Sequence, residues 1–212
     1  MPKDALDKTS ESDTQKKLAR SHKFYAIFNR LKLIQRWSLM HNQCPEDVAQ
    51  HSHQTAVFAH ALGVIDKTVF KKDTDPGKCA TIALFHEASE VLTGDMPTPV
   101  KYRNTAMYEA YKEAEKDATD RLLYCLPAEI EPKIRAVVRP APCREAFLVK
   151  CADKIAAYIK CVEELKAGNT EFAAARRSAE RLITGYRDET VDYFMARFAD
   201  AFSLNLDELM DE

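Results

Sequence analysis

The segment His86-Glu87-Ala88-Ser89-Glu90 carries the residue types best suited to chemistry. His86 and Glu90 are four residues apart and Glu87 and Glu90 are three apart, so the three side chains can share one edge of a helix. The residues before them are apolar, and an imidazole with two carboxylates is costly to bury there unless something neutralises the acids. A divalent cation would do so. The alternative is an edge of the helix that faces solvent.

His51 is a second candidate ligand. It shares a stripe of a predicted helix with apolar residues such as Leu62, so we expect it to point into the core. A lone inward histidine is more often a hydrogen-bonded core residue than a ligand. His53 and His60 fall on the opposite side of that helix and lie roughly 10 Å apart along its axis, too far to hold one ion together.

Asp153 is the third candidate, and it lies far along the chain. Its small neighbours Ala152 and Ala156 leave room beside the carboxylate, but the segment on its own favours a solvated acid flanked by Lys150 and Lys154. Taken together, the candidates supply two imidazoles and two carboxylates. Such a set suits Co²⁺, Mn²⁺ or Zn²⁺ better than Mg²⁺ or Ca²⁺.

The elements that would position these residues are helices. The chain has only five glycines, and apolar residues recur with a period near 3.6, which predicts an all-α protein built as one helical bundle. No linker or internal repeat divides it. The predicted helices cover residues 21–37, 47–65, 79–92, 105–123, 127–138, 144–167, 170–184 and 188–202, and residues 1–20 form a polar tail that precedes the domain at 21–212.

Composition limits the partners of this chain of 212 residues. The 31 basic and 33 acidic residues give a net charge of −2, which offers no general attraction to a nucleic-acid polymer or an anionic membrane. An anionic ligand must therefore be held by a local site. The six cysteines form no C-x-x-C pair, no apolar run is long enough to span a bilayer, and we expect reduced, mostly buried thiols in a cytoplasmic protein.

The order of a histidine, a histidine–acid pair and a distant aspartate resembles the HD superfamily of phosphohydrolases, whose metal site follows the pattern H…HD…D. Longer segments at 30–37, 88–102, 158–165 and 191–195 are similar to the bacterial YfbR-type 5′-deoxynucleotidases, and this likeness runs from about residue 21 to 209. Two positions depart from the pattern. Glu87 replaces the aspartate of the pair and is one methylene longer, and Gln50 replaces a glutamate before the first histidine.

The resemblance implies a fold of the HD-domain type and the hydrolysis of deoxynucleoside 5′-monophosphates to deoxynucleosides and phosphate. It also implies a homodimer and a divalent transition metal, with Co²⁺ favoured and Mn²⁺ or Zn²⁺ as other choices. The expected metal ligands are His51, His86, Glu87 and Asp153, three of which (His51, Glu87 and Asp153) would also contact substrate.

Arg36 would clamp the phosphate, because a guanidinium grips two oxygens and stays charged at any working pH. Without the family context, a solvated cation at a helix end would be the favoured interpretation. Trp37, the only tryptophan, would by resemblance lie against the sugar where a ribose 2′-hydroxyl would be, although a lone tryptophan more often covers a core.

Glu90 and Asp95 are the unpaired acids nearest the expected metal helix. One would orient or deprotonate water and the other would protonate the leaving 5′-oxygen, and the sequence does not assign the two roles. Glu90 could also be structural. The expected substrate-binding loop consists of Asp95, Met96, Pro97 and Thr98.

Two other functions fit parts of the pattern. The first is another HD-type activity on cyclic nucleotides or nucleoside triphosphates, but a triphosphate site would need more basic residues than Arg36 and Lys101. The second is a metal- or nucleotide-binding module that has lost catalysis because of Glu87. A purely structural helical protein would not explain the acids and histidines on buried stripes.

Overall fold

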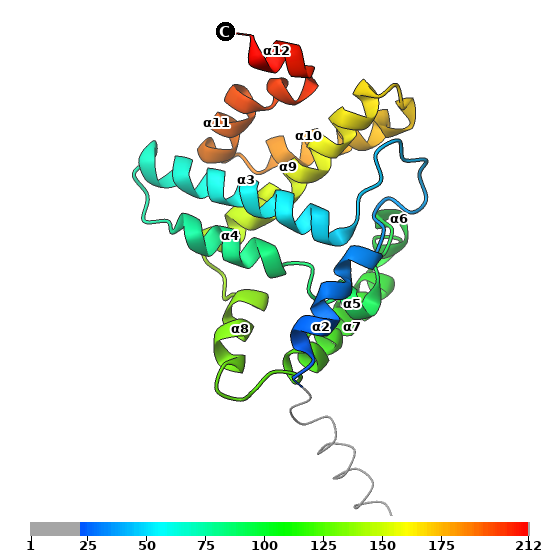
Figure 1. Cartoon of the computed structure of the whole chain (residues 1–212), viewed down its shortest axis with the longest axis vertical. Helices are drawn as coiled ribbons and strands as arrows, with labels where there is room; N and C mark the ends of the chain where they lie inside the picture. The colour runs from blue at the N-terminus through cyan, green and yellow to red at the C-terminus, as the bar shows by residue number, and fades with distance from the viewer. Residues whose placement is uncertain (1–21, 212) are drawn as a thin grey trace, which may run out of the picture.

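The computed structural model describes residues 22–211, and within that range it contains helices joined by short connections (Figure 1). The polar tail predicted at 1–20 lies outside the described residues. The elements are α2 (Phe24–Phe28), η2 (Asn29–Leu33), α3 (Val48–Thr68), α4 (Pro76–Phe85), α5 (Glu90–Thr93), α6 (Thr98–Lys101), α7 (Thr105–Leu123), α8 (Glu131–Val138), α9 (Arg144–Lys166), η3 (Thr170–Phe172), α10 (Ala173–Gly185), α11 (Glu189–Phe198), η4 (Asp200–Ser203) and α12 (Leu206–Met210). The predicted all-α, single-domain bundle is confirmed.

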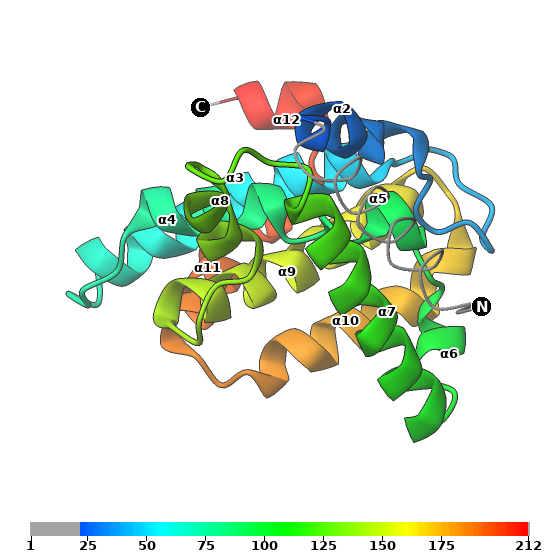
Figure 2. The same ribbon diagram turned by 90° about the horizontal axis from the view of Figure 1, so that it is seen from below.

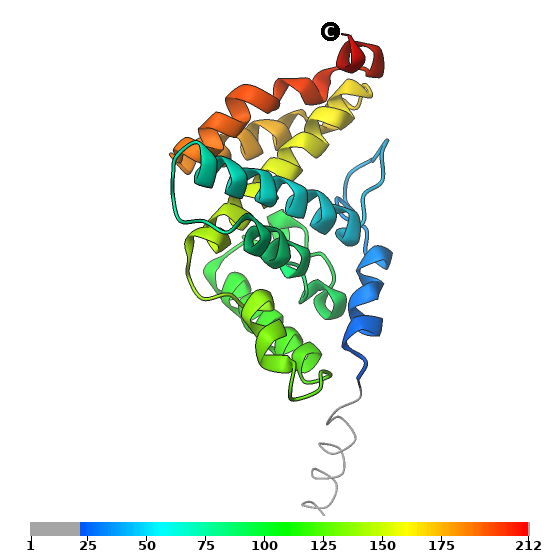
Figure 3. The same cartoon turned by 60° about the vertical axis from the view of Figure 1, so that its left-hand side comes forward.

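Helices α3, α4 and α9 form the centre of the bundle. Their facing sides supply fully buried residues such as Leu62, Ala83 and Ile155 to one hydrophobic cluster, and α10 runs alongside α9 (Figure 2). A second cluster, around Phe24 and Leu122, joins α2 to α7 at the lower end of the molecule (Figure 3). The chain passes from the first cluster to the second directly after α4.

Glycine is required where α3 crosses α4. A Cβ atom at Gly63 would lie 2.8 Å from the Cα atom of Pro76 and 3.1 Å from Sγ of Cys79, so a larger residue would push the two helices apart. The start of α4 is also fixed locally, because the Asp75 carboxylate accepts hydrogen bonds from the first backbone amides of the helix. This close crossing packs the start of α4 against the second half of α3.

A buried ion pair fixes α9 against α3. The Arg144 guanidinium donates from Nε and Nη2 to the two carboxylate oxygens of Asp66, at 3.0 and 2.6 Å, and from Nη1 to Asp188 at 2.6 Å. Asp66 is completely buried, and although burial alone would raise its pKa, the hydrogen bonds from Arg144 and two threonines hold that pKa well below its usual range. The bidentate geometry sets the register between the two helices.

Glu164 of α9 anchors the connection between η2 and α3. Its carboxylate accepts hydrogen bonds from the backbone amides of Gln43, at 3.0 Å, and Cys44, at 2.9 Å. Lys160 donates both to Glu164 and to the carbonyl oxygen of Cys44. Burial would raise the pKa of Glu164, but these donors lower it to about 2. The loop is therefore held by charge-assisted bonds from the core helix.

Two further features are the state of the cysteines and the apolar character of the helices. All six cysteines are free, and four of them are buried: Cys79, Cys125, Cys151 and Cys161. None of the described helices combines the length and the apolar character that a membrane crossing requires.

Candidate metal centre

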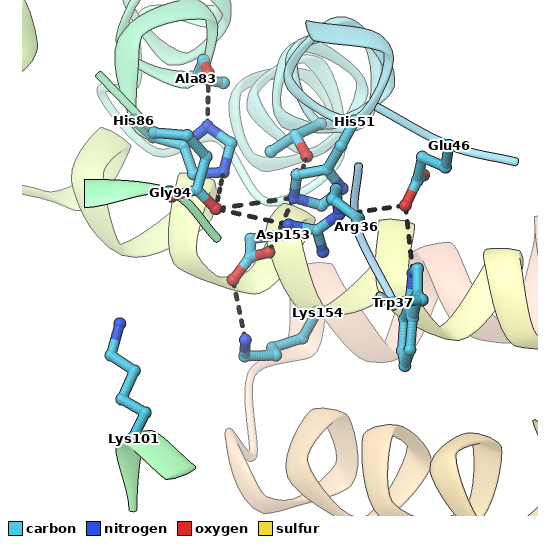
Figure 4. A network of polar contacts seen from close by, with 12 residues as sticks. Arg36, Trp37, Glu46, His51, Ala83, His86, Gly94, Lys101, Asp153 and Lys154 are labelled. Atoms are coloured by element: carbon cyan, nitrogen blue, oxygen red, sulfur yellow. Dashed lines mark hydrogen bonds and ion pairs between the residues drawn. The ribbon is translucent and has the colours of Figure 1, made fainter. Parts of the chain in front are cut away.

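The structure brings His51, His86, Glu87 and Asp153 together. Figure 4 labels His51, His86 and Asp153 of this group. One ligand atom from each of the four lies within 4.8 Å of the others. His51 Nε2 is 3.1 Å from Oδ1 of Asp153, and Oε1 of Glu87 is 3.3 Å from His86 Nε2 and 3.9 Å from His51 Nε2. His51 comes from α3, Asp153 comes from α9, and the adjacent pair follows α4.

The helix predicted over residues 79–92 is wrong at the residues that matter most. Helix α4 ends at Phe85, residues 86–89 form turns, and α5 begins at Glu90. Neighbouring residues of a regular helix project about 100° apart. The turns at residues 86–89 present both His86 and Glu87 to the same centre, with His86 Nε2 3.3 Å from Glu87 Oε1. The single helical edge expected for His86, Glu87 and Glu90 is therefore not present.

His86 is held in one tautomer by the end of its own helix. Its Nδ1 atom donates to the carbonyl oxygen of Ala83 at 2.6 Å, which leaves the lone pair on Nε2. That Nε2 atom is buried without a hydrogen-bond partner, close to the Glu87 carboxylate. An unsatisfied buried imidazole nitrogen facing two carboxylates is the donor set that a divalent transition metal requires. The residues present therefore fit such an ion.

The protonation states of the site also suit a cation. Burial and the positive charge of Arg36 lower the pKa of His51, which keeps its imidazole neutral. Burial opposes ionisation of Glu87 and Asp153, but His86 lowers the pKa of Glu87 to about 2, and His51 with Lys154 holds the pKa of Asp153 well below its usual range. Glu87 in turn raises the pKa of His86 against the effect of burial, so a metal would displace a proton from this imidazole. Neutral imidazole and ionised carboxylate are the forms that bind metal.

Arg36 and Trp37 lie beside this centre, but not on the helix predicted for them. The 3-10 helix η2 ends at Leu33, and an isolated antiparallel bridge then pairs Gln35 with Asp47. Trp37 adopts a positive φ of 57°, which is rare for a bulky residue. The predicted helix therefore extends too far, because backbone pairing with the segment before α3 replaces helical hydrogen bonds.

The Arg36 side chain is 12% exposed, and its Nη1 atom lies 3.8 Å from Oε1 of Glu87. Burial would lower the pKa of this guanidinium, but the surrounding carboxylates raise it. The Trp37 ring is half-buried, and its centroid is 5.2 Å from that of Phe172. Arg36 thus presents a desolvated positive charge at the edge of the candidate metal centre.

Glu90 and Asp95 are two further acidic residues near the candidate metal centre, close enough to Glu87 and Arg36 to interact with their charges. Glu90 is buried, its Oε2 atom has no hydrogen-bond partner, and burial together with Glu87 and Asp95 raises its pKa to about 9. Burial also raises the pKa of Asp95, against the effect of Arg36. The rest of the expected substrate loop follows between α5 and α6: Met96 and Pro97 are half-buried, and Thr98 is exposed at the start of α6.

Comparison with known proteins decides the family. The model of the YfbR-like 5′-deoxynucleotidases matches residues 23–202. The chain belongs to this family. A 5′-deoxynucleotidase of Enterobacter sp. (strain 638) is 44% identical over 197 residues, which cover 92% of this chain and 98% of the relative. The YfbR 5′-deoxynucleotidase of Photorhabdus temperata is 44% identical over 88% of this chain and 95% of its own. The resemblance to YfbR-type enzymes is confirmed.

Solved structures share the fold of this YfbR-like chain. An HD-domain phosphohydrolase from Listeria innocua superposes with a TM-score of 0.76 at 24% identity, over 85% of this chain and 88% of that one. The HD phosphohydrolase of cyanophage S-2L, solved with dA and one catalytic Zn²⁺ ion, gives a TM-score of 0.61 at 17% identity, over 84% and 95%. Both likenesses show an HD-type helical fold.

Two residues at the site of this YfbR-like chain are missed by sequence reasoning. Lys154 donates from Nζ to Oδ2 of Asp153 at 2.9 Å, whereas the sequence suggested only a solvated flank. Glu46 accepts hydrogen bonds from both Arg36 and Trp37. Neither contact follows a helical spacing, and a loop acid nine or ten positions away carries no periodic signal. Lys101, in contrast, is already paired with Glu115 at 2.9 Å.

Proposed function

We propose that this chain hydrolyses deoxynucleoside 5′-monophosphates to deoxynucleosides and inorganic phosphate with a bound divalent metal. The observation that carries the proposal is the convergence of four ligand atoms within 4.8 Å, beside a nearly buried guanidinium that faces them. The named activity of the family supports the substrate class. The fold alone would not, because one fold serves many functions.

His51, His86, Glu87 and Asp153 would hold the metal, for which Co²⁺ is favoured and Mn²⁺ or Zn²⁺ would also fit. The bound ion would lower the pKa of water and withdraw charge from a phosphoryl oxygen. The Zn²⁺ ion named for the cyanophage enzyme supports a transition metal in this fold. Glu87 fits the set in spite of its extra methylene, because its Oε1 atom reaches both histidines.

Arg36 would bind the phosphate. Its Nε atom is engaged by Glu46 at 3.0 Å, which leaves the two terminal nitrogens for phosphoryl oxygens. The guanidinium is fixed and largely desolvated before substrate arrives, so it stabilises developing negative charge without reorganisation. Lys154, bound to Asp153 at 2.9 Å, brings a second positive charge to the site.

Glu90 and Asp95 would move the protons. The attacking water loses a proton as its oxygen bonds to phosphorus, and the leaving 5′-oxygen gains one as its bond to phosphorus breaks. With a pKa of about 9, Glu90 carries a proton at neutral pH. Asp95, the other acid of the pair, lies just beyond α5 in the expected substrate loop. One acid of this pair would donate and the other would accept.

Trp37 would select the deoxy sugar. Its ring is held by Glu46 and by Phe172, so it can act as a fixed wall where a 2′-hydroxyl would lie. A pocket that merely fails to welcome a hydroxyl discriminates by only about 10². Met96, Pro97 and Thr98 would complete the substrate loop after Asp95.

A nucleotide panel tests this function. Phosphate release is measured from dAMP, AMP, 3′-dAMP, a cyclic nucleotide and dATP, with chelator and then with Co²⁺, Mn²⁺ or Zn²⁺. We expect metal-dependent release, fastest from dAMP. Release only from dATP or the cyclic nucleotide would indicate another HD-type activity, and metal binding without release would indicate a binding module. The predicted homodimer and cytoplasmic location are tested separately, by light scattering and cell fractionation.

A further inference from the structure

A single carboxylate oxygen joins the two residues proposed to recognise phosphate and sugar. Oε2 of Glu46 accepts hydrogen bonds from Nε of Arg36 at 3.0 Å and from Nε1 of Trp37 at 3.2 Å (Figure 4). The Glu46 side chain is only 8% exposed. We propose that Glu46 is a positioning residue that couples phosphate binding to sugar selection. This inference rests on the proposed function and names a residue that acts through its neighbours.

Arg36 needs a partner other than Glu87. Its Nη1 atom is 3.8 Å from Oε1 of Glu87, and an unrestrained guanidinium would close this distance to form a direct ion pair. That ion pair would engage Glu87, a proposed metal ligand, and the terminal nitrogens of Arg36 that are proposed to bind phosphate. The bond from Nε to Glu46 holds the guanidinium from its other edge and balances its charge. Glu46 therefore keeps Arg36 available.

Trp37 needs restraint because its backbone is strained. A positive φ of 57° is unfavourable for a bulky residue and persists only where its surroundings hold it. The ring is held at one end by Glu46 and on one face by Phe172, and Asn42 donates to the Trp37 carbonyl oxygen at 3.2 Å. The Glu46 bond is the contact that fixes the rotation of the indole, because Nε1 is its only polar atom.

Glu46 is itself fixed by the fold. Its carbonyl oxygen accepts a hydrogen bond from the Arg36 amide at 2.9 Å, next to the Gln35–Asp47 bridge. The loop before it is tied to α9 through Glu164. The Glu46 carboxylate thus belongs to a segment that the fold holds in place, and it sets the positions of both Arg36 and Trp37. Loss of Glu46 should change phosphate affinity and sugar preference together, although Glu46 is not proposed to contact the substrate.

The first test uses fluorescence of the full-length protein, because Trp37 is the only tryptophan. Glu46→Gln and Glu46→Ala are compared with Glu129→Gln, which changes an exposed acid. If Glu46 holds the indole, the emission of Glu46→Ala shifts to the red and acrylamide quenches it more strongly, and Glu46→Gln, whose amide oxygen can still accept from Nε1, changes less. The control stays like wild type. Unchanged emission and quenching in Glu46→Ala would overturn the proposal, and this readout needs neither metal nor turnover.

The second test uses the metal-loaded enzyme. We measure kcat and KM for dAMP and AMP in wild type, Glu46→Gln, Trp37→Phe and the double variant. Trp37→Phe keeps an aromatic ring but removes the donor to Glu46. Glutamine can still accept a hydrogen bond but lacks the charge that strengthens it, a difference worth about tenfold, so we expect KM for dAMP to rise by about that factor in Glu46→Gln and the preference for dAMP over AMP to shrink.

The double variant supplies the decisive comparison. If Glu46 acts on selectivity through the Trp37 indole, Glu46→Gln causes no further loss of the preference for dAMP once Trp37 is phenylalanine, so the double variant matches Trp37→Phe. Multiplying effects would show that Glu46 does not act on selectivity through Trp37 and would overturn the coupling. A Glu46→Gln variant with a lower melting temperature but unchanged KM and preference would also overturn it. Failure of the proposed function is distinct, because wild type itself would then show no activity or no preference.

Discussion

The Nδ1 atom of His86 lies 2.6 Å from the carbonyl oxygen of Ala83, one turn earlier at the end of α4. The same carbonyl oxygen also accepts a hydrogen bond from the His86 backbone amide, at 3.4 Å, where the helix ends. The contact at Nδ1 orients the imidazole and leaves Nε2 directed at Glu87. The same interruption of the helix therefore fixes the tautomer of one proposed ligand and the position of the next.

We predict that one transition metal binds per chain and stabilises the fold, because the unfolded chain cannot present four ligands from separate elements. At a metal concentration 100 times the dissociation constant, the stabilisation is about 2.7 kcal/mol. Elemental analysis and thermal melts with and without chelator measure both effects. His86→Ala should lose the metal, and the exposed His53→Ala should keep it. Full occupancy in His86→Ala would exclude His86 as a ligand.

Glu87→Asp should remain active and change the order of preferred metals. Glu87 Oε1 lies 3.8 Å from Arg36 Nη1 and within 4.8 Å of the other three ligand atoms. Aspartate is one methylene shorter, so these distances would change. Phosphate release by both proteins is measured across Co²⁺, Mn²⁺ and Zn²⁺. An inert wild type that Glu87→Asp restores to activity would instead mean that glutamate at this position marks a lost enzyme.

Arg36 and Trp37 should have separable effects on turnover. Arg36→Ala should reduce kcat/KM for every nucleotide by about 10²–10³, because it removes a charge that all transition states share. Trp37→Ala should chiefly narrow the gap between dAMP and AMP. Steady-state kinetics on dAMP, AMP and 3′-dAMP distinguish the two effects. Equal hydrolysis of the three nucleotides by wild type would show that the Trp37 ring does not exclude a ribose 2′-hydroxyl.

Glu164 should make stability depend on acid pH. Its pKa is about 2 in the folded protein, below the usual 4.5, so it stabilises the fold fully above pH 4.5 and progressively less as the pH falls toward 2. The difference corresponds to about 3 kcal/mol. Urea unfolding at neutral pH and within that window should show a smaller pH dependence for Glu164→Gln than for wild type. An equal dependence in both proteins would remove Glu164 as the cause.

The sequence predicts the helices that periodicity describes. Apolar stripes through residues 47–65 and 144–167 place α3 and α9 correctly, and with α3 the inward position of His51, whereas Asp153 was a candidate only through the family pattern. The interruption after Phe85 has no such signal, because residues 86–89 contain neither glycine nor proline. It arises where the chain leaves one hydrophobic cluster, near Ala83, and enters the other at Ala88. Tertiary packing overrides the local pattern there.

The contacts of Arg36 could not be predicted from the sequence, for a different reason. Its partner Glu46 lies ten positions away across an antiparallel bridge, and neither helical nor strand periodicity identifies a two-residue pairing. The sequence could name Arg36 and Trp37 only through the family pattern. The backbone that positions them, and the acid that joins them, required the three-dimensional structure.

The left-handed backbone at Trp37 suits glycine, whereas the proposed discrimination against ribonucleotides needs the tryptophan ring. Glycine adopts a positive φ without strain, so Trp37→Gly should be more stable than Trp37→Ala, the reverse of the usual order, by about 1 kcal/mol. Among replacements of this tryptophan that are selected for thermal resistance alone, glycine should therefore be the most frequent. Selection for sparing ribonucleotides should retain tryptophan, with its backbone strain offset by the contacts of the ring with Glu46 and Phe172.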